Sequence, residues 1–140
     1  TLSLIHNAQP PSILTSARPW LQRILDEGRF NLEHGYAEEE ALPIAQMIAT
    51  CPAIIPEVLI HGDYTIDNVL VDGGRITGII DWGRGDIGDA RYDLTLATRA
   101  QEPESAFLDE ADFVAFYAGY GGERLNRAEE QWFFDLYGYF

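Results

Sequence analysis

The feature that most constrains the fold of this chain is a set of short β-type segments, separated by turn residues, near its centre. Apolar and β-branched residues form three short runs, at Val58–His61, Asn68–Val71 and Ile76–Asp81. The Asp-Gly-Gly triplet at 72–74 lies between the second and third runs and predicts a tight hairpin turn. The runs are too short to form a large sheet, so helices must supply most of the core.

Helical patterns flank this centre on both sides. Residues 1–15 contain Pro10-Pro11 and predict an arm or loop, and residues 84–89 predict a loop rich in Gly and Asp. Gly28 is expected to end the first helix, and Pro43 either kinks the second helix or marks its start. The predicted helices are Ala17–Glu27, Glu38–Thr50, Tyr92–Arg99, Asp109–Ala118 and a last one that begins at Asn126 with a capping box to Glu129.

Length and charge narrow the range of functions. The 140 residues predict a single domain, 1–140, of the α+β class, mainly α. A net charge of −14 argues against a nucleic-acid partner, because affinity for nucleic acid comes largely from neutralised phosphates. No apolar run approaches the roughly 18 residues that a membrane span needs. The single cysteine, Cys51, fits a reducing compartment, so we expect a cytoplasmic protein without a membrane partner.

Three polar residues in the β-rich centre have the chemistry of phosphoryl transfer. Asp63 follows a short strand and precedes a loop, Asn68 lies five positions later, and Asp81 lies thirteen beyond that. Transfer from a nucleotide needs a residue that orients the attacking hydroxyl and receives its proton, together with oxygen ligands for magnesium. Asp63 suits the first role. The hairpin lets Asn68 and Asp81 face one ion, so they suit the second.

In this context the sequence resembles a known family. The His-Gly-Asp triplet at 61–63, Asn68 and the Ile-Asp-Trp-Gly segment at 80–83 resemble the aminoglycoside phosphotransferase family of small-molecule kinases, which is similar in fold to protein kinases. Protein kinases carry His-Arg-Asp and Asp-Phe-Gly at the matching places, so Gly62 stands for the arginine and Trp82 for the phenylalanine. The resemblance is strong over residues 55–100 and implies the C-terminal lobe of a protein-kinase-like fold with a small β-hairpin core.

The resemblance also implies a role for individual residues and implies ATP and Mg²⁺ as cofactors. The Gly88–Leu94 segment matches a family motif, with Ala90 in place of the usual proline, and its Asp93 would brace the catalytic loop through buried hydrogen bonds. The remaining implied roles are Asp63 as catalytic base, Asn68 and Asp81 as magnesium ligands, His61 as structural support of the loop, and Leu70 and Ile80 as the floor under the adenine.

The smaller, nucleotide-binding lobe of that family has no counterpart here. About 60 residues precede the catalytic loop and predict loop and helix, and no lysine occurs to pair with the phosphates. Two explanations stay open. The chain is one lobe of a longer kinase and inactive by itself, which its start at Thr1 and its intact motifs favour, or it is a reduced, catalytically inactive binding or assembly module.

The implied reaction is ATP-dependent phosphorylation of a hydroxyl on a small molecule. An aminoglycoside-like cation is the favoured acceptor, while choline, homoserine, methylthioribose and macrolides stay open. Carboxylates that could meet a cation are Asp86, Asp89, Asp109 and Asp112, although ordinary surface acidity explains them as well.

The second hypothesis concerns the surface that a missing lobe would leave. Leu70, Val71 and Ile80 lie near it, and an exposed apolar patch of this kind is usually covered by a partner. We therefore expect self-association through this surface.

Overall fold

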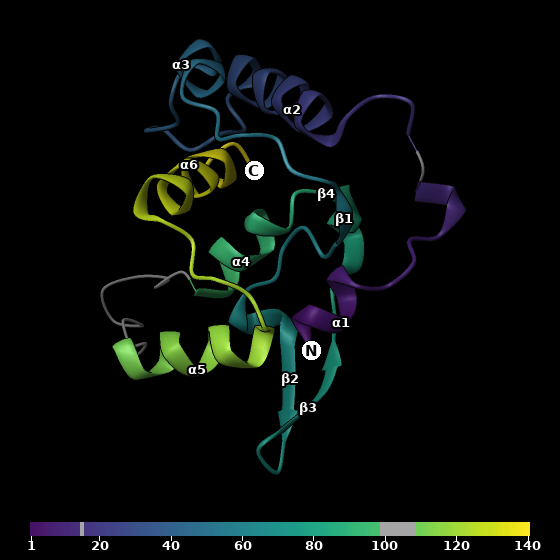
Figure 1. The fold of residues 1–140 in the computed structure, drawn as a ribbon. Coiled ribbons are helices and arrows are strands. Elements are labelled where there is room, and N and C mark those ends of the chain that lie inside the picture. Colours follow the sequence, from purple (N-terminus) through teal and green to yellow (C-terminus); the bar gives the residue numbers. More distant parts are fainter. Residues whose placement is uncertain (15, 99–108) are drawn as a thin grey trace.

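The computed structural model describes residues 1–14, 16–98 and 109–140 (Figure 1). Helices dominate, and two small antiparallel sheets lie between them, which confirms the predicted class and the kinase-like core. In chain order the elements are α1 (Leu2–His6), α2 (Trp20–His34), α3 (Ile44–Ala49), β1 (Val58–Ile60), β2 (Val69–Asp72), β3 (Arg75–Ile79), β4 (Asp86–Gly88), α4 (Ala90–Thr98), α5 (Glu110–Tyr120) and α6 (Arg127–Tyr137). Short 3₁₀ turns occur at Ser12–Leu14, Ile66–Asn68 and Trp82–Arg84.

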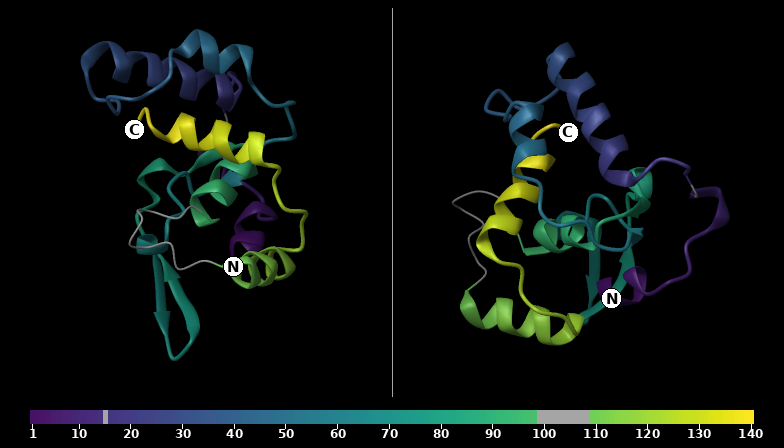
Figure 2. Two further views of the ribbon diagram at one scale, coloured as in Figure 1. Left: turned by 90° about the vertical axis from the view of Figure 1, so that its left-hand side faces the viewer. Right: turned by 45° about the horizontal axis from the view of Figure 1, so that its top comes forward.

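The two sheets have different surroundings. Strands β2 and β3 form the predicted hairpin, with Val69 opposite Ile79, and it extends away from the helices in Figure 1 and in the left view of Figure 2. Strand β1 pairs instead with β4, with Leu59 opposite Ile87, inside the body of the molecule. The prediction of an irregular loop over 84–89 is therefore wrong in part. A three-residue strand of sequence Asp-Ile-Gly has no alternation that could reveal it, and only its pairing with β1 defines it.

Helix α4 lies at the centre of the helical body and has an apolar core on each side. Tyr92 and Leu96 belong to the larger core, which α2, α3, β1 and α6 complete, and Leu94 belongs to a smaller core shared with α1 and α5. Figure 2 shows α6 crossing over α4 with α2 and α3 beyond it. Because α4 is enclosed from both sides, the charged side chain of Asp93, which is buried there, needs hydrogen-bond partners within the protein.

The structure corrects the end of the first predicted helix. Helix α2 continues through Gly28 and ends at Gly35, which has the left-handed φ of 73°. Gly28 is buried against the ring of Tyr139, and a Cβ atom there would lie only 3.0 Å from the Tyr139 Cγ atom. Glycine at this position therefore permits close packing of α2 on the C-terminal segment and does not terminate the helix.

Two further predictions fail near the N-terminal half. Helix α3 begins at Ile44, directly after Pro43, so Pro43 marks the start of the helix, which was one of its two predicted roles, and the acidic residues at 38–40 precede the helix. Residues 2–6 form the short helix α1, where we expected only an arm or loop. Five residues cannot make a stable helix alone, and α1 exists because Leu2 and His6 are buried against the rest of the protein.

The C-terminal helices agree closely with their predictions. Asn126 and Glu129 form the expected capping box at the start of α6, and Asp109 caps α5 in the same way with Asp112. Arg99, the predicted end of α4, lies outside the described residues. In the part of the chain that the structure describes, no helix has the length and apolar character to cross a bilayer.

Candidate active site

The segment that carries Asp63 leaves β1 through a turn that requires glycine. Gly62 has a φ of 81°, and a Cβ atom placed on it would lie 2.2 Å from the Arg84 carbonyl oxygen. Any side chain at this position would collide with the backbone that follows Asp81. The sequence motif therefore contains glycine because two segments of the site touch here.

The loop rests on a buried carboxylate from α4. Asp93 is 0% exposed, and its Oδ2 accepts a hydrogen bond of 2.7 Å from the backbone N–H of His61 while Oδ1 accepts one of 2.8 Å from that of Gly62. Charge-assisted bonds to backbone N–H groups are among the stronger ones in a protein interior. Asp93 thus orients the residues immediately before Asp63.

The side chain of His61 joins the loop to the segment that carries Asp81. Its Nε2–H donates to the Ile80 carbonyl at 2.8 Å, and its Nδ1 accepts from the Asp63 backbone N–H at 3.3 Å. This pair of bonds defines the tautomer with the proton on Nε2. The buried ring also packs edge-on against Trp82, with centroids 4.6 Å apart, so His61 holds both halves of the motif in register.

Asp63 and Asn68 are in direct contact. The Asn68 Nδ2 group donates to the Asp63 carboxylate at 3.0 Å and to the Asp63 carbonyl oxygen at 2.8 Å. Because both of these bonds use the amide nitrogen, they leave the Oδ1 oxygen of Asn68 as a potential ligand atom.

The hairpin brings the backbone of Ile80, the residue before Asp81, against Asn68. The Ile80 N–H donates to the Asn68 carbonyl oxygen at 3.0 Å, which continues the β2–β3 ladder by one step. Asp81 itself has a φ of 59° and is the one non-glycine residue with positive φ among those described. Such a conformation in a residue with a side chain is costly and occurs disproportionately at functional sites.

These residues fit a magnesium ion of the kind that nucleotide phosphates carry. Among the described residues no group of three or more His, Cys, Asp or Glu side chains is placed to hold a metal by itself. Magnesium bound with phosphates needs only one or two protein oxygens, because phosphate oxygens and water complete its shell. An amide oxygen from Asn68 and an exposed carboxylate from Asp81 supply that number of hard donors.

The predicted adenine floor lies on the exposed hairpin. Leu70 is 46% exposed and Ile80 is 45% exposed, and a Cβ atom placed on Gly78 of the neighbouring strand would lie 3.5 Å from the Leu70 Cδ1 atom. Exposed apolar residues at the base of a hairpin, beside the proposed metal ligands, suit contact with a flat aromatic base.

A cavity of about 450 Å³ opens between α2, the 83–86 segment and the start of the catalytic loop at Gly62. Charged residues of both signs line it. Asp86 forms a two-point ion pair with Arg23, and this hydrogen bond raises the pKa of Arg23. Glu27 and Arg84 form a longer ion pair, with 3.8 Å between Glu27 Oε1 and Arg84 Nη1. Of the four carboxylates proposed to meet a substrate, Asp86 is the one that borders this cavity.

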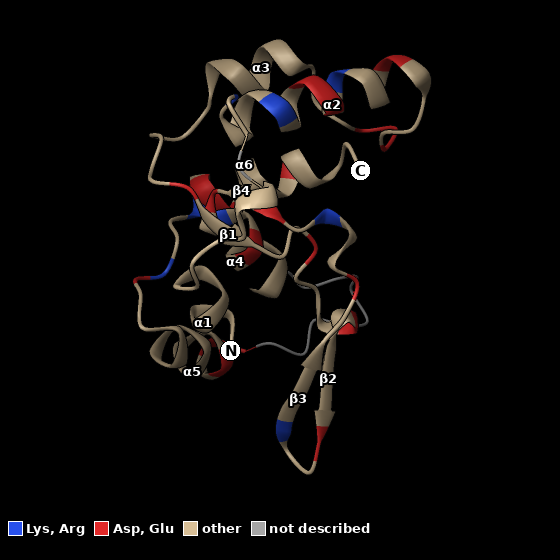
Figure 3. Cartoon of the chain, turned by 90° about the vertical axis from the view of Figure 1, so that its right-hand side faces the viewer, with Lys and Arg blue, Asp and Glu red and all other residues tan. Residues whose placement is uncertain are grey.

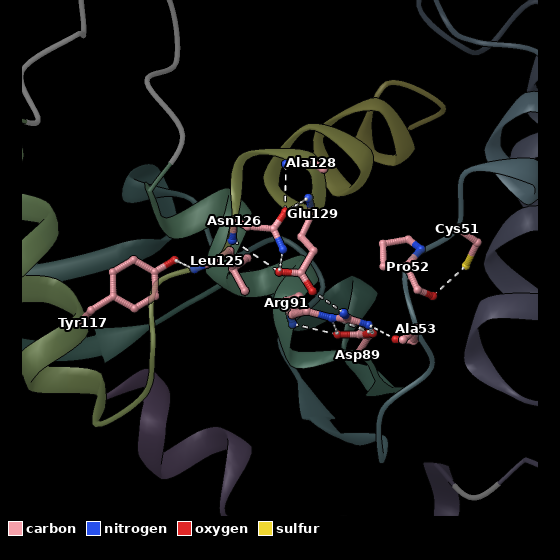
Figure 4. Close-up of polar contacts among 10 residues, drawn as sticks. All are labelled: Cys51, Pro52, Ala53, Asp89, Arg91, Tyr117, Leu125, Asn126, Ala128 and Glu129. Atoms are coloured by element: carbon pink, nitrogen blue, oxygen red, sulfur yellow. Dashed lines mark hydrogen bonds and ion pairs between the residues drawn. The ribbon is translucent and has the colours of Figure 1, made fainter.

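The other three carboxylates have structural partners elsewhere. Figure 4 shows Asp89 paired with Arg91, which also binds Glu129 and the Ala53 carbonyl oxygen. The Asp89 hydrogen bond is the main cause of the raised pKa of Arg91. Asp109 and Asp112 form the capping box of α5 and do not line the cavity. The structure therefore brings Asp86 to the site and leaves Asp89, Asp109 and Asp112 outside it.

Two residues of the site were not found from the sequence. His6 in α1 is buried, and its Nε2 lies 3.1 Å from Asp93 Oδ2 while its Nδ1 lies 2.9 Å from the Tyr120 hydroxyl. Tyr137, at the end of α6, donates from its hydroxyl to Asp63 Oδ1 at 3.3 Å. His6 lies 87 positions from its partner and Tyr137 lies 74, and no local pattern marks either.

With this geometry in view, the similarity to known proteins is informative. A family model described as "Phosphotransferase enzyme family" matches residues 1–127. The chain belongs to this family. The structure also resembles that of an aminoglycoside-3'-phosphotransferase of type VIII, with a TM-score of 0.77 and 23% identity over 99% of this chain and 57% of that one, which shows a shared fold.

The sequence relatives of this chain include homoserine kinases and aminoglycoside 3'-phosphotransferases. A homoserine kinase from Neisseria meningitidis serogroup B is 42% identical over 82 residues, covering 57% of this chain and 27% of that protein. An aminoglycoside 3'-phosphotransferase from Streptomyces fradiae is 33% identical over 113 residues, covering 76% of this chain and 42% of that protein. The chain therefore spans less than half the length of these relatives.

Proposed function

We propose that the protein containing this chain transfers the γ-phosphoryl group of ATP to a hydroxyl group of a small molecule. In this reaction the acceptor oxygen forms a bond to phosphorus, the bond to the ADP oxygen breaks, and the hydroxyl proton passes to Asp63. Family membership supports the reaction class. The observation that carries the proposal is the hydrogen-bonded contact between Asp63 and Asn68, beside Asp81, at the end of a braced loop.

The proposal assigns a task to each residue of the site. Asp63 orients the acceptor hydroxyl and receives its proton. Such a carboxylate suffices because the transition state of phosphoryl transfer is loose and positioning dominates. Asn68 and Asp81 would hold Mg²⁺, which when bound neutralises charge on the phosphates. Leu70 and Ile80 form the floor under the adenine. His61 and Asp93 keep the loop in place.

Residues 1–140 would then form one domain, the C-terminal lobe of a kinase whose nucleotide is also contacted from a smaller lobe. The similar chains are much longer than this one, which supports that view. The 140 residues alone would bind ATP–Mg²⁺ weakly and turn over negligibly, since they contain no lysine to pair with the phosphates. Such a kinase would work in the cytoplasm.

The acceptor is proposed to enter the cavity beside Gly62. An aminoglycoside-like cation is the favoured class, because the chain is acidic overall (Figure 3) and the cavity lining includes Glu27, whose ion pair with Arg84 is long at 3.8 Å. Homoserine is the second candidate. It carries both an ammonium and a carboxylate group, which would match the opposed charges of Glu27 and Arg84, and a homoserine kinase is among the relatives.

The test is an acceptor panel assayed with the protein as its gene encodes it, with ATP consumption as the readout. Aminoglycosides, homoserine, choline, methylthioribose and macrolides are compared at equal concentration. Stimulation of ATP consumption by one class, with a phosphorylated product of the expected mass, supports the proposal and names the acceptor. Absence of turnover with every hydroxyl compound would overturn it.

A second candidate function is a catalytically inactive binding or assembly module. The exposed apolar hairpin face supports it, since Val71 is 62% exposed and Ile76 is 46% exposed in addition to Leu70 and Ile80. This hypothesis predicts self-association through the hairpin. Sedimentation velocity on the 140-residue chain tests it: a dimer that Val71→Asp dissociates supports it, and a monomer at every concentration rules it out.

A further inference from the structure

The carboxylate of Asp63 is held at both oxygens, and one of the two partners comes from the far end of the chain. Asn68 binds Oδ2 from within the catalytic loop, at 3.0 Å. Tyr137 binds Oδ1 through its hydroxyl, at 3.3 Å, from the last residue of α6. A carboxylate bonded at one oxygen can still rotate, whereas one bonded at both has a defined plane.

Helix α6 presents this tyrosine from a rigid position. Trp132 and Leu136 are buried in the main core, and the Trp132 indole N–H donates to the Met47 carbonyl oxygen at 2.9 Å. Just beyond the helix, the Gly138 carbonyl accepts from the Glu38 N–H at 2.8 Å. The half-buried ring of Tyr137 also packs near Tyr92, with centroids 6.4 Å apart. The hydroxyl position therefore follows from the packing of the whole helix.

From this geometry we propose that Tyr137 is a positioning residue for phosphoryl transfer. Its O–H orients the Asp63 carboxylate so that a lone pair faces the acceptor hydroxyl. A misplacement of about 1 Å in a reacting group can lower a rate by two orders of magnitude, so the orientation of this carboxylate matters. The inference rests on the proposed phosphotransfer and adds to it a coupling between the C-terminal helix and the catalytic loop.

A purely structural role for Tyr137 makes a different prediction. If only the ring mattered, through its contacts with the core, removal of the hydroxyl would leave turnover unchanged. Tyr137→Phe keeps the ring and deletes the hydrogen bond. The matched control is Tyr139→Phe, two positions along, which deletes the bond from the buried Tyr139 to the Leu42 carbonyl oxygen, away from the loop.

The experiment compares steady-state kinetics of these variants in the protein as its gene encodes it, with the acceptor found by the panel. Tyr137→Phe is expected to lower kcat roughly ten- to 150-fold, the loss implied by one hydrogen bond to a charged group, without changing the KM for ATP. Tyr139→Phe is expected to lower the melting temperature but not kcat. If Tyr137→Phe folds poorly, Tyr137→Met provides a second variant without a donor.

A double-mutant cycle isolates the contact. In an Asp63→Ala background, Tyr137→Phe should cause no further loss, because the group through which it acts is gone. An unchanged kcat in Tyr137→Phe, while Asp63→Ala lowers kcat by orders of magnitude, overturns this inference and leaves the proposed function intact. An equal further loss in the Asp63→Ala background also overturns it. A wild-type protein that phosphorylates nothing overturns both.

Discussion

The two sides of the catalytic loop are built by opposite means. On one side Asp93, 0% exposed, binds two backbone N–H groups of the loop and the ring of His6. On the other side the hairpin offers Leu70 and Ile80, each nearly half exposed, and few polar contacts. The residues proposed to react thus lie on a loop that buried charged hydrogen bonds hold in place, while the proposed nucleotide surface is open and apolar. Changes on the two sides should therefore have different consequences.

The largest expected effect lies between the two sides, at Asp63. Asp63→Ala removes the proposed base and should lower kcat by about 10²–10⁴-fold, the usual contribution of a positioned general base. Nucleotide affinity, measured by calorimetry, should stay nearly unchanged because Asp63 is not a proposed nucleotide contact. Asp67→Ala, an exposed carboxylate in the same loop, is the matched control and should leave kcat as it is. Equal kcat values in both variants would show that Asp63 is not the catalytic base.

Next in size is the buried side. Asp93→Asn keeps the shape of the side chain but turns an N–H donor toward backbone N–H groups that need an acceptor. The free energy of unfolding, measured with urea, should therefore fall by roughly 2–4 kcal/mol. Asp72→Asn, at the exposed hairpin turn, serves as the control, and its free energy of unfolding should stay within about 0.5 kcal/mol of the wild-type value. Should Asp93→Asn prove as stable as the wild type, the brace would not carry the stability assigned to it.

The smallest effect is expected on the hairpin side. Leu70→Asp should leave the melting temperature nearly unchanged, because the side chain is 46% exposed. It should weaken ATP binding about tenfold, since a charged group replaces an apolar contact with the base. The control is Ile13→Asp, which alters a residue that is 88% exposed and distant in sequence from the hairpin. A loss of stability without a loss of ATP affinity would reverse the comparison between the two sides.

The parts of the fold that the sequence predicted well are governed by local rules. The capping box at Asn126 and Glu129, the Asp-Gly-Gly hairpin turn and the position of α5 each depend on residues within a few positions of one another. The triplet around Asp63, with Asn68 and Asp81, was recognisable for a related reason. A loop and one hairpin place these groups, so their spacing along the chain reflects their spacing in space.

The parts that were missed depend on contacts between distant segments. Strand β4 exists because β1 pairs with it, and Gly28 continues a helix because Tyr139 packs on it. The residues next to β4 in sequence do not predict a strand, and those next to Gly28 do not predict that the helix continues through it. Of the four candidate substrate carboxylates, composition alone could not separate Asp86, which borders the cavity, from the three that have structural partners elsewhere.

By itself, the sequence determined the family, the mainly helical class and the three polar residues of the proposed transfer, because these follow from local geometry and from chemistry that tolerates few substitutes. Only the tertiary structure decided what surrounds them. His6 meets Asp93 and Tyr137 meets Asp63 across 87 and 74 positions. Contacts at such separation form when α1, α4 and α6 pack together, and apolar packing leaves no pattern near the polar residues that it brings into contact.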